Sequence, residues 1–171
     1  MDTAEFRKTL ETWDLPLGPF REPEDIVNEM RETAIEMGPA AASALAELAT
    51  AIDRDRLPNR QVFIEFMNYY AKAFPEELAS ALSDRLSADG PPLPVLILGS
   101  TGSGTASSRL LSVLNLETAD DDLLEALAST LGELGDVRAI EALRALGKRD
   151  DLSERVRNEI NIALWNDSGQ T

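Results

Sequence analysis

The sequence predicts an all-α protein made of stacked helical hairpins, and two observations support this fold class. Within residues 131–147, LGELGDVRAIEALRALG, one helix ends, the chain turns at Gly135-Asp136 and a second helix begins. A fixed repeat length with retained apolar positions is typical of units that bury their cores against each other. A shift of 33 residues shows such a repeat, because it places Leu98, Gly99, Gly102, Ala106, Leu110 and Val113 on Leu131, Gly132, Gly135, Ala139, Leu143 and Leu146, and Leu123, Leu127 and Leu131 on Val156, Ile160 and Leu164.

Composition and charge narrow the class of protein. The 171 residues suit a single domain with a sizeable core, and only 5% of them are aromatic, which favours helices over sheets. The formal net charge of −15 is spread along the chain. It disfavours nucleic acid as a partner, because phosphate binding needs clustered Lys and Arg, and a basic protein surface is the better electrostatic match.

Three further features of the sequence indicate the cellular compartment of the protein. The absence of cysteine excludes disulfides and thiolate chemistry. No apolar run reaches the roughly 20 residues of a membrane span, and the start, MDTAEFRKTLETWD, lacks the apolar core of a signal peptide. We therefore expect a cytoplasmic protein with no membrane partner.

Residues 1–23 are expected to cap one end of the stack. Residues 3–12 suit a short amphipathic helix with Phe6 and Leu10 on one side, and residues 13–23 form a loop with three prolines and a glycine. The alternative is a docking patch, although exposed apolar patches of that size are uncommon on monomers. The residues expected to cover the terminal unit, whose apolar face would otherwise contact water, are Trp13, Leu15, Leu17 and Phe20.

Residues 24–86 are expected to form two divergent hairpins, of which the first spans 24–52. Gly38-Pro39 separates its two helices, and the polar residues 53–60 connect it to the second hairpin. Apolar residues at helical spacing mark both helices: Ile26, Val27, Met30, Ala34 and Met37 in residues 24–37, and Leu45, Leu48, Ala49 and Ile52 in residues 40–52.

The second hairpin begins with residues 61–74. Tyr69 lies off the centre of the apolar stripe, beside Glu65, Asn68 and Lys72, and a partly exposed tyrosine beside mixed charge suits an interface hot spot. Simple packing at the edge of the core is the alternative. Pro75, Glu76 and Glu77 suit the first turn of the next helix, which is expected to run to about Leu86. The core stripe of residues 61–74 consists of Phe63, Met67, Tyr70 and Phe74.

The breaker SADGPPLP, residues 87–94, could be a domain linker, but the repeat starts directly after it, so a loop inside one continuous domain of residues 1–171 is expected. In residues 94–171, where the repeats are clearer, Gly99 and Gly104 have the spacing of a phosphate-binding loop. However, Thr105 and Ala106 stand where that loop needs Lys and Ser or Thr. Alignment with LGELGDVRA favours a turn between helices.

Three consecutive aspartates, residues 120–122, raise the alternative of a Ca²⁺ or Mg²⁺ site. Neither the spacing of an EF-hand nor a supporting glycine is present. Thr118 and the aspartates directly precede LLEALASTL, so they suit an N-cap with an acidic first turn. We expect no metal site and no cofactor.

Residues 120–165 carry a resemblance to a known family. A first helix ends in Leu131-Gly132, the turn is Gly135-Asp136, and the second helix opens with Arg138-Ala139. This pattern resembles HEAT repeats, specifically the short HEAT-like repeats first associated with phycobilin lyases. It matches residues 94–114 in part, and residues 24–86 are only hairpin-like. In the preceding unit Ser103 and Thr105 replace the Asp and Arg, which is expected to interrupt the polar ladder between repeats.

The resemblance implies a right-handed alpha-alpha superhelix of about four helical hairpins plus a terminal helix. Its second helices, here residues 40–52, 76–86, 106–114 and 137–147, would line a concave face that binds other proteins. For each polar residue on that face the alternative is a solvated helix surface, with pairs such as Glu141 and Arg144. The candidate partner-binding residues are Glu47, Glu76, Asp84, Arg109, Arg138, Glu141 and Arg144, together with Tyr69.

The absence of histidine excludes a Ser-His-Asp triad, an imidazole zinc site and a histidine general base. Two enzymatic alternatives remain. A carboxylate pair could act as acid and base, and a role in bilin attachment is suggested only by the family name. We expect a non-enzymatic scaffold or adaptor that binds a protein partner with a basic surface. The alternative is an immunity or antitoxin-type inhibitor of a basic toxin or nuclease, and homo-oligomers through the ends of the stack are a further expectation.

Overall fold

The computed structural model describes residues 3–13, 22–55, 60–114 and 120–168, and within these ranges every regular element is a helix. The prediction of an all-α protein is therefore confirmed. The helices are α1 (Thr3–Trp13), α2 (Pro23–Met37), the short 3-10 helix η1 (Pro39–Ala41), α3 (Ala42–Asp55), α4 (Arg60–Ala73), α5 (Pro75–Ser83), α6 (Leu93–Ser100), α7 (Gly104–Leu114), α8 (Asp121–Leu134), α9 (Val137–Leu146) and α10 (Glu154–Ser168).

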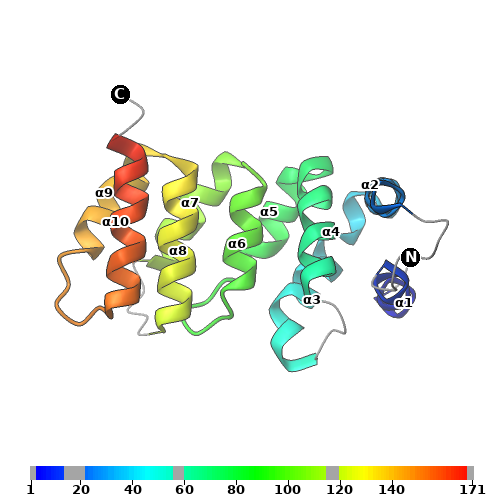
Figure 1. Cartoon of the computed structure of the whole chain (residues 1–171), viewed down its shortest axis with the longest axis horizontal. Helices are drawn as coiled ribbons and strands as arrows, with labels where there is room; N and C mark the ends of the chain where they lie inside the picture. The colour runs from blue at the N-terminus through cyan, green and yellow to red at the C-terminus, as the bar shows by residue number, and fades with distance from the viewer. Residues whose placement is uncertain (1–2, 14–21, 56–59, 115–119, 169–171) are drawn as a thin grey trace.

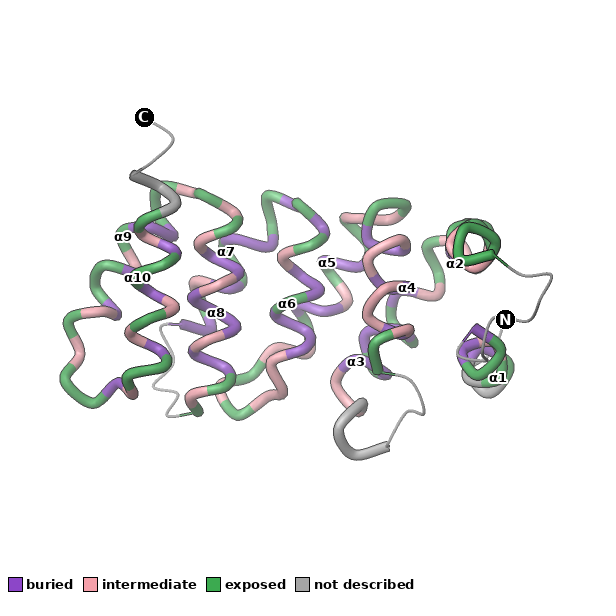
Figure 2. Tube along the Cα trace, in the orientation of Figure 1, coloured by how far each residue is buried: buried purple, intermediate pink, exposed green. Residues whose placement is uncertain are grey.

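The helices form two rows (Figure 1). In the first row α2, α4, α6, α8 and α10 contact one another in this order, and in the second row α3, α5, α7 and α9 do the same. Helices that are adjacent in sequence, such as α4 and α5 or α8 and α9, join the rows. Figure 2 shows that the buried positions of α4 to α10 gather where the two rows meet. Most of these helices therefore bury one apolar side and leave the other exposed, whereas α6 is buried on nearly all sides and exposes only Leu96 and Ser100.

The turns between α6 and α7 and between α8 and α9 share one geometry. Gly102 and Gly135, which the 33-residue shift aligns, both have φ of +61°, a left-handed conformation that glycine adopts without steric cost. Asp136 then caps α9, because its carboxylate accepts a hydrogen bond from the backbone N–H of Arg138 at 2.8 Å. The residues that the shift aligns inside α7 and α9 are all buried: Ala106, Leu110 and Val113 with Ala139, Leu143 and Leu146.

The N-terminal helix covers the aromatic face of α4. Phe6, Leu10 and Trp13 are buried, and the ring of Phe66 lies 4.7 Å from that of Phe6 and 5.4 Å from that of Trp13, between centroids. The indole N–H of Trp13 also donates to Glu29 of α2 at 3.1 Å. Helix α1 and Trp13 therefore cover apolar surface of α4, while the role of residues 1–23 as the cap of a stack stays a prediction. The other residues expected in the cap, Leu15, Leu17 and Phe20, lie outside the described residues.

Several predicted boundaries were wrong. Residues 53–55 continue α3 and Arg60 already belongs to α4, so the predicted connection 53–60 is shorter. Helix α5 ends at Ser83 rather than near Leu86, because the chain tightens into turns in which Arg85 N–H bonds the carbonyl of Leu82. Helix α6 begins at Leu93, inside the predicted loop 87–94. The side chain of Ile52 and residue Thr118 lie outside what the structure describes.

The acidic run before α8 acts as a cap, as predicted. The carboxylate of Asp120 accepts a hydrogen bond from the backbone N–H of Leu123 at 3.0 Å, and Asp121 and Asp122 occupy the first turn. Among the described residues no group of three or more acidic side chains is arranged to hold a metal ion. None of the described helices has the length and hydrophobicity that crossing a membrane requires.

Candidate acidic docking site

The structure divides the eight predicted partner-binding residues between the two rows. Tyr69 lies on α4 in the first row, where the guanidinium carbon of Arg31 is 5.2 Å and the Nζ of Lys72 is 5.9 Å from its ring centroid. This arrangement is a cation–π contact between α2 and α4. The remaining seven residues are exposed on the second row or at its helix ends, namely Glu47, Glu76, Asp84, Arg109, Arg138, Glu141 and Arg144.

Two of these seven, Glu76 and Asp84, meet in one hollow of about 520 Å³ between η1, α3 and α5. We call it the acidic hollow, because Glu77 is the third carboxylate in its lining and Arg85 is the only described cation there. Small residues of η1 and α3 form the opposite wall. The complete lining is Pro39, Ala40, Ala42, Ser43, Glu76, Glu77, Ser80, Ala81, Asp84 and Arg85.

The core holds one wall of the acidic hollow in place. Tyr70 is buried on α4, and its hydroxyl donates a 2.7 Å hydrogen bond to the carbonyl of Gly38, the residue before Pro39. Burial, and next the nearby carboxylate of Glu77, raise the pKa of Tyr70 to about 12. The phenol therefore stays protonated and remains a donor at neutral pH. The corner at Gly38-Pro39 is fixed from inside the protein.

The other wall depends on Arg85. Its guanidinium donates to the carbonyl of Ala81 within α5 and to the hydroxyl of Ser43 on α3, both at 3.0 Å. These bonds orient the guanidinium across the gap between α3 and α5, and they leave the three carboxylates without a shared cation at the centre of the hollow. A planar group with fixed donors can hold two elements in a defined geometry.

The three carboxylates differ in what they already bind. Glu76 accepts a hydrogen bond from the hydroxyl of Ser103 at 2.9 Å, and Asp84 forms an exposed ion pair with Arg109 at 3.4 Å. Glu77 has no ion pair within the described part of the chain. The three carboxylates outnumber the two cations near them, Arg85 in the lining and Arg109 paired with Asp84, so the hollow has a net negative charge. Such a concave site favours a cationic side chain from a partner.

The contact between Ser103 and Glu76 corrects one expectation. Ser103 was expected to interrupt the polar contacts between successive units, but its hydroxyl links the start of α7 to α5. Asp136 makes the matching contact one unit later, since it accepts a 3.0 Å hydrogen bond from Ser107 of α7. Serine retains this contact because its hydroxyl can donate to a carboxylate. Only the ion pair between Asp136 and Arg138 lacks a counterpart in the earlier unit.

The far end of the second row has a different charge. Arg109, Arg138 and Arg144 are exposed on α7 and α9, with Glu141 as the exposed acid among them. Arg138 pairs with Asp136 at 2.8 Å. The bonds from the Arg138 side chain, from its backbone N–H and from Ser107 hold the pKa of Asp136 well below its usual range. The seven candidates therefore do not form one acidic face, and only the α3–α5 part suits a basic partner.

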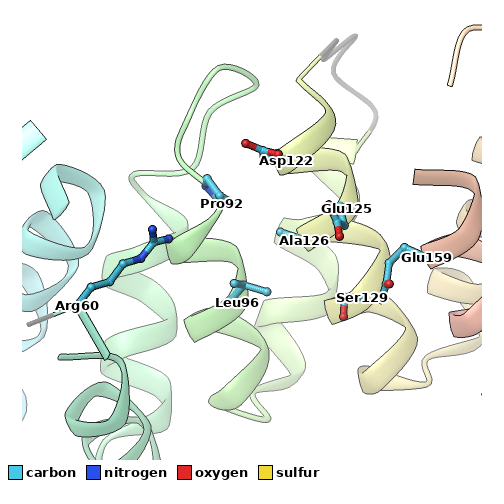
Figure 3. A pocket seen from close by; sticks show the side chains of 8 residues that line it. All are labelled: Arg60, Pro92, Leu96, Asp122, Glu125, Ala126, Ser129 and Glu159. Atoms are coloured by element: carbon cyan, nitrogen blue, oxygen red, sulfur yellow. The ribbon is translucent and has the colours of Figure 1, made fainter. Parts of the chain in front are cut away.

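A second hollow of about 360 Å³ lies on the first row, between α6, α8 and α10 (Figure 3). Two of its three carboxylates form ion pairs, because Arg155 of α10 pairs with Asp122 and, at 2.9 Å, with Glu125, and Glu159 is the third. Figure 3 shows Leu96 extending from α6 on the side of α8, and Arg60 extending from α4 toward Pro92. Within the described chain one carboxylate of this hollow, Glu159, has no ion pair, against two in the acidic hollow, Glu76 and Glu77, so we place the candidate site between α3 and α5.

Sequence reasoning placed Glu76 and Asp84 on the correct row but missed the rest of the site. Glu77 was assigned only to the helix dipole, although its neighbour was a candidate. The bond between Arg85 and Ser43 joins residues 42 positions apart, and the Tyr70 to Gly38 bond joins residues 32 apart. Neither pair leaves a local pattern in the sequence, because each depends on how α3, α4 and α5 pack.

Comparison with known proteins yields no match. No family model matches the chain, and neither a curated protein nor a solved structure is found to be similar to it. The functional conclusion therefore depends on the residues of the chain itself.

Proposed function

We propose that the chain is a non-enzymatic docking protein that binds a basic segment of a protein partner in the acidic hollow. The observation that carries this proposal is the convergence of Glu76, Glu77 and Asp84 on one concave site opposite the small residues of η1 and α3. A lysine or arginine side chain could enter between them, with its aliphatic stem against Pro39 and Ala40. Charge-assisted hydrogen bonds to carboxylates would then supply orientation.

The architecture suits such a role. Two rows of helices in sequential contact, and turns repeated after 33 residues, support our proposal that the fold is a HEAT-like solenoid with a right-handed superhelix. In a solenoid each unit contacts its neighbours, so that a row of second helices presents an extended surface. The acidic hollow would then be one part of that surface, and the face from α7 to α9 would contact a less basic part of the partner.

The test compares three baits in an affinity pull-down at low salt, read by quantitative mass spectrometry. The hollow variant carries Glu76→Gln, Glu77→Gln and Asp84→Asn. The matched control neutralises three exposed acids of α2, Glu24→Gln, Glu32→Gln and Glu36→Gln. Each variant changes the net charge from −15 by +3 to −12. Loss of a basic partner with the hollow variant but not with the control is the expected result. Equal capture by all three baits would contradict the site.

The charge of −15 also supports a second candidate, a stoichiometric inhibitor that covers a basic toxin or nuclease. Binding kinetics with the isolated partner separate the two roles. One partner with fast, salt-sensitive association and high affinity would indicate the inhibitor, whereas weak binding to several partners would indicate the adaptor. Charge reversal at Glu76 and Asp84 should slow association in both cases.

A further inference from the structure

The last helix, α10, presents an uncharged stripe to solvent. Asn158, Asn161, Ile162 and Trp165 follow one another at the spacing i, i+3, i+4, i+7, so they share one side of the helix. They line a shallow hollow of about 490 Å³. Ile162 is 54% and Trp165 77% exposed, which makes them two of the five large hydrophobic residues exposed in the described chain. We call these four residues the α10 stripe.

The 33-residue repeat identifies what the α10 stripe corresponds to. The equivalent residues of α8 are Glu125, Ala128, Ser129 and Gly132, and this side of α8 faces α10. Two contacts show that this side of α8 faces α10: Glu125 pairs with Arg155 of α10 at 2.9 Å, and Gly132 lies against Ala163 of α10. The same side of α6 faces α8, since Gly99 lies against Thr130. The α10 stripe is therefore the side on which a further first-row helix would pack.

Trp165 prevents such a helix from packing in the same way. It occupies the position of Gly99 and Gly132, where even an added methyl carbon would come within 2.4 Å of Thr130 and 2.5 Å of Ala163, respectively. A tryptophan there cannot accept a helix at the spacing found between α6, α8 and α10. Another hairpin, from this or another copy, cannot extend the row by the repeat geometry. Head-to-tail stacking of copies by the repeat geometry is therefore blocked at this end, whereas a closed, two-fold pairing does not require that close approach.

We propose that the α10 stripe is the interface of a homodimer, in which two copies pair through α10 about a two-fold axis. None of the four residues carries a charge, whereas the chain as a whole carries −15, so two copies meet here with less repulsion than across an acidic face such as the acidic hollow. Asparagine both donates and accepts hydrogen bonds, so Asn158 and Asn161 can pair with the same residues of the second copy. Trp165 and Ile162 supply the apolar contact, and tryptophan is enriched among residues that dominate binding energy.

The size of the α10 stripe limits the expected affinity of the dimer. A 15-residue helix is about 22 Å long, and one such face is smaller than the roughly 800 Å² per partner of a standard interface. The dimer should therefore be weak and depend on concentration. Added salt should not dissociate it, because salt screens the repulsion between two acidic chains. Binding of a basic partner in the acidic hollow should weaken with salt, so the two proposals fail or succeed separately.

Sedimentation velocity on the full chain, from low to high micromolar concentration, tests the proposal. The wild type should shift from monomer to dimer. Trp165→Glu and, separately, Ile162→Glu should raise the dissociation constant at least ~10-fold, since each places like charges together across the two-fold axis. Val137→Glu, at a residue 73% exposed on α9, is the matched control and should dimerise like the wild type. Far-UV circular dichroism verifies that each variant is folded.

Three results would overturn the proposal. The first is a wild type that stays monomeric at every concentration. The second is the formation of species larger than a dimer, and the third is a dimer whose dissociation constant both stripe variants leave unchanged. Dissociation of the wild-type dimer by moderate salt would also overturn it, because it would show that charged residues outside the α10 stripe form the interface. If Trp165→Glu fails to fold, Ile162→Glu alone decides.

Discussion

Gly132 of α8 lies so close to Ala163 of α10 that a methyl carbon added to the glycine would be 2.5 Å from Ala163 Cβ and 3.0 Å from its Cα. The same relationship recurs one unit earlier between Gly99 and Thr130, at 2.4 Å. Ala163 and Thr130 are themselves 33 residues apart, so the two close approaches follow the repeat. Glycine at these positions allows successive first-row helices to pack with their backbones near each other.

Gly132→Ala should destabilise the protein. Overpacking costs about 1–3 kcal/mol, and the better helix propensity of alanine recovers about 1 kcal/mol. The difference is a net loss of about 0–2 kcal/mol in the free energy of unfolding, and we expect the upper half of this range because the closest atoms include the Ala163 backbone, which cannot move without α10. Urea denaturation measures it. Adding Ala163→Gly should restore part of the loss by removing the nearest carbon.

The control for this substitution is Gly104→Ala. Gly104 begins α7, and a methyl carbon there would meet no atom within 4 Å. The free energy of unfolding of the Gly104→Ala variant should be unchanged or slightly higher, since alanine restricts the unfolded chain. A Gly132→Ala variant as stable as Gly104→Ala would show that α8 and α10 separate easily and would remove the packing argument.

The order of the helices and much of the core could be predicted from the sequence. The apolar periodicity and the glycine positions are local signals, and the shared φ of Gly102 and Gly135 agrees with them. Helix ends were harder to predict. The end of α5 at Ser83 depends on the backbone hydrogen bonds of Arg85 and Leu86. Neither residue type is characteristic of a turn. Propensity alone does not separate a last helical turn from such tight turns.

The candidate site was predictable only in part. Exposure on the second row follows from helical phase, so Glu76 and Asp84 could be named. Their grouping with Glu77 and Arg85 in one hollow depends on the distance between α3 and α5, which no local pattern encodes. The mixed charge of α9, with Arg138 and Arg144 beside Glu141, is by contrast a local feature of the sequence.

Asp136 should make stability depend on acid pH. Its pKa is lowered in the folded protein, chiefly by Arg138, so its contribution is present above the ordinary carboxyl pKa of about 4 and is lost as pH falls toward the lower folded value. Asp136→Asn keeps a side chain that can cap α9 but removes the charge. The melting temperature of the variant should lie below that of the wild type at pH 6, and the difference should begin to narrow as pH falls below about 4, because the unfolded wild-type chain then binds a proton that the folded Asp136 does not. A difference independent of pH would contradict this assignment.

Tyr70 should make stability fall as pH rises into the alkaline range, whereas Asp136 makes it fall at acid pH. Because its folded pKa of about 12 lies above the usual value of 10, protonated Tyr70 favours the folded state, and this contribution is lost as pH rises from 10 toward 12. Tyr70→Phe removes the bond to Gly38 and should cost about 0.5–1.5 kcal/mol at neutral pH. The gap between wild type and variant should narrow above pH 10 in thermal melts. A constant gap would show that the phenol does not titrate with unfolding.

Ser83 and Ser107 are both buried in second-row helices, but only Ser107 has a partner. The hydroxyl of Ser83 has no hydrogen bond, whereas that of Ser107 donates to Asp136 at 3.0 Å. Burying an unpaired hydroxyl costs about 1 kcal/mol or more, so Ser83→Ala should leave the free energy of unfolding unchanged or raise it by about that amount. Ser107→Ala should lower it, because the Asp136 carboxylate loses a donor. Urea denaturation of both variants tests the contrast. Equal losses for the two would mean that the Ser83 hydroxyl is bonded in solution, for instance to a buried water.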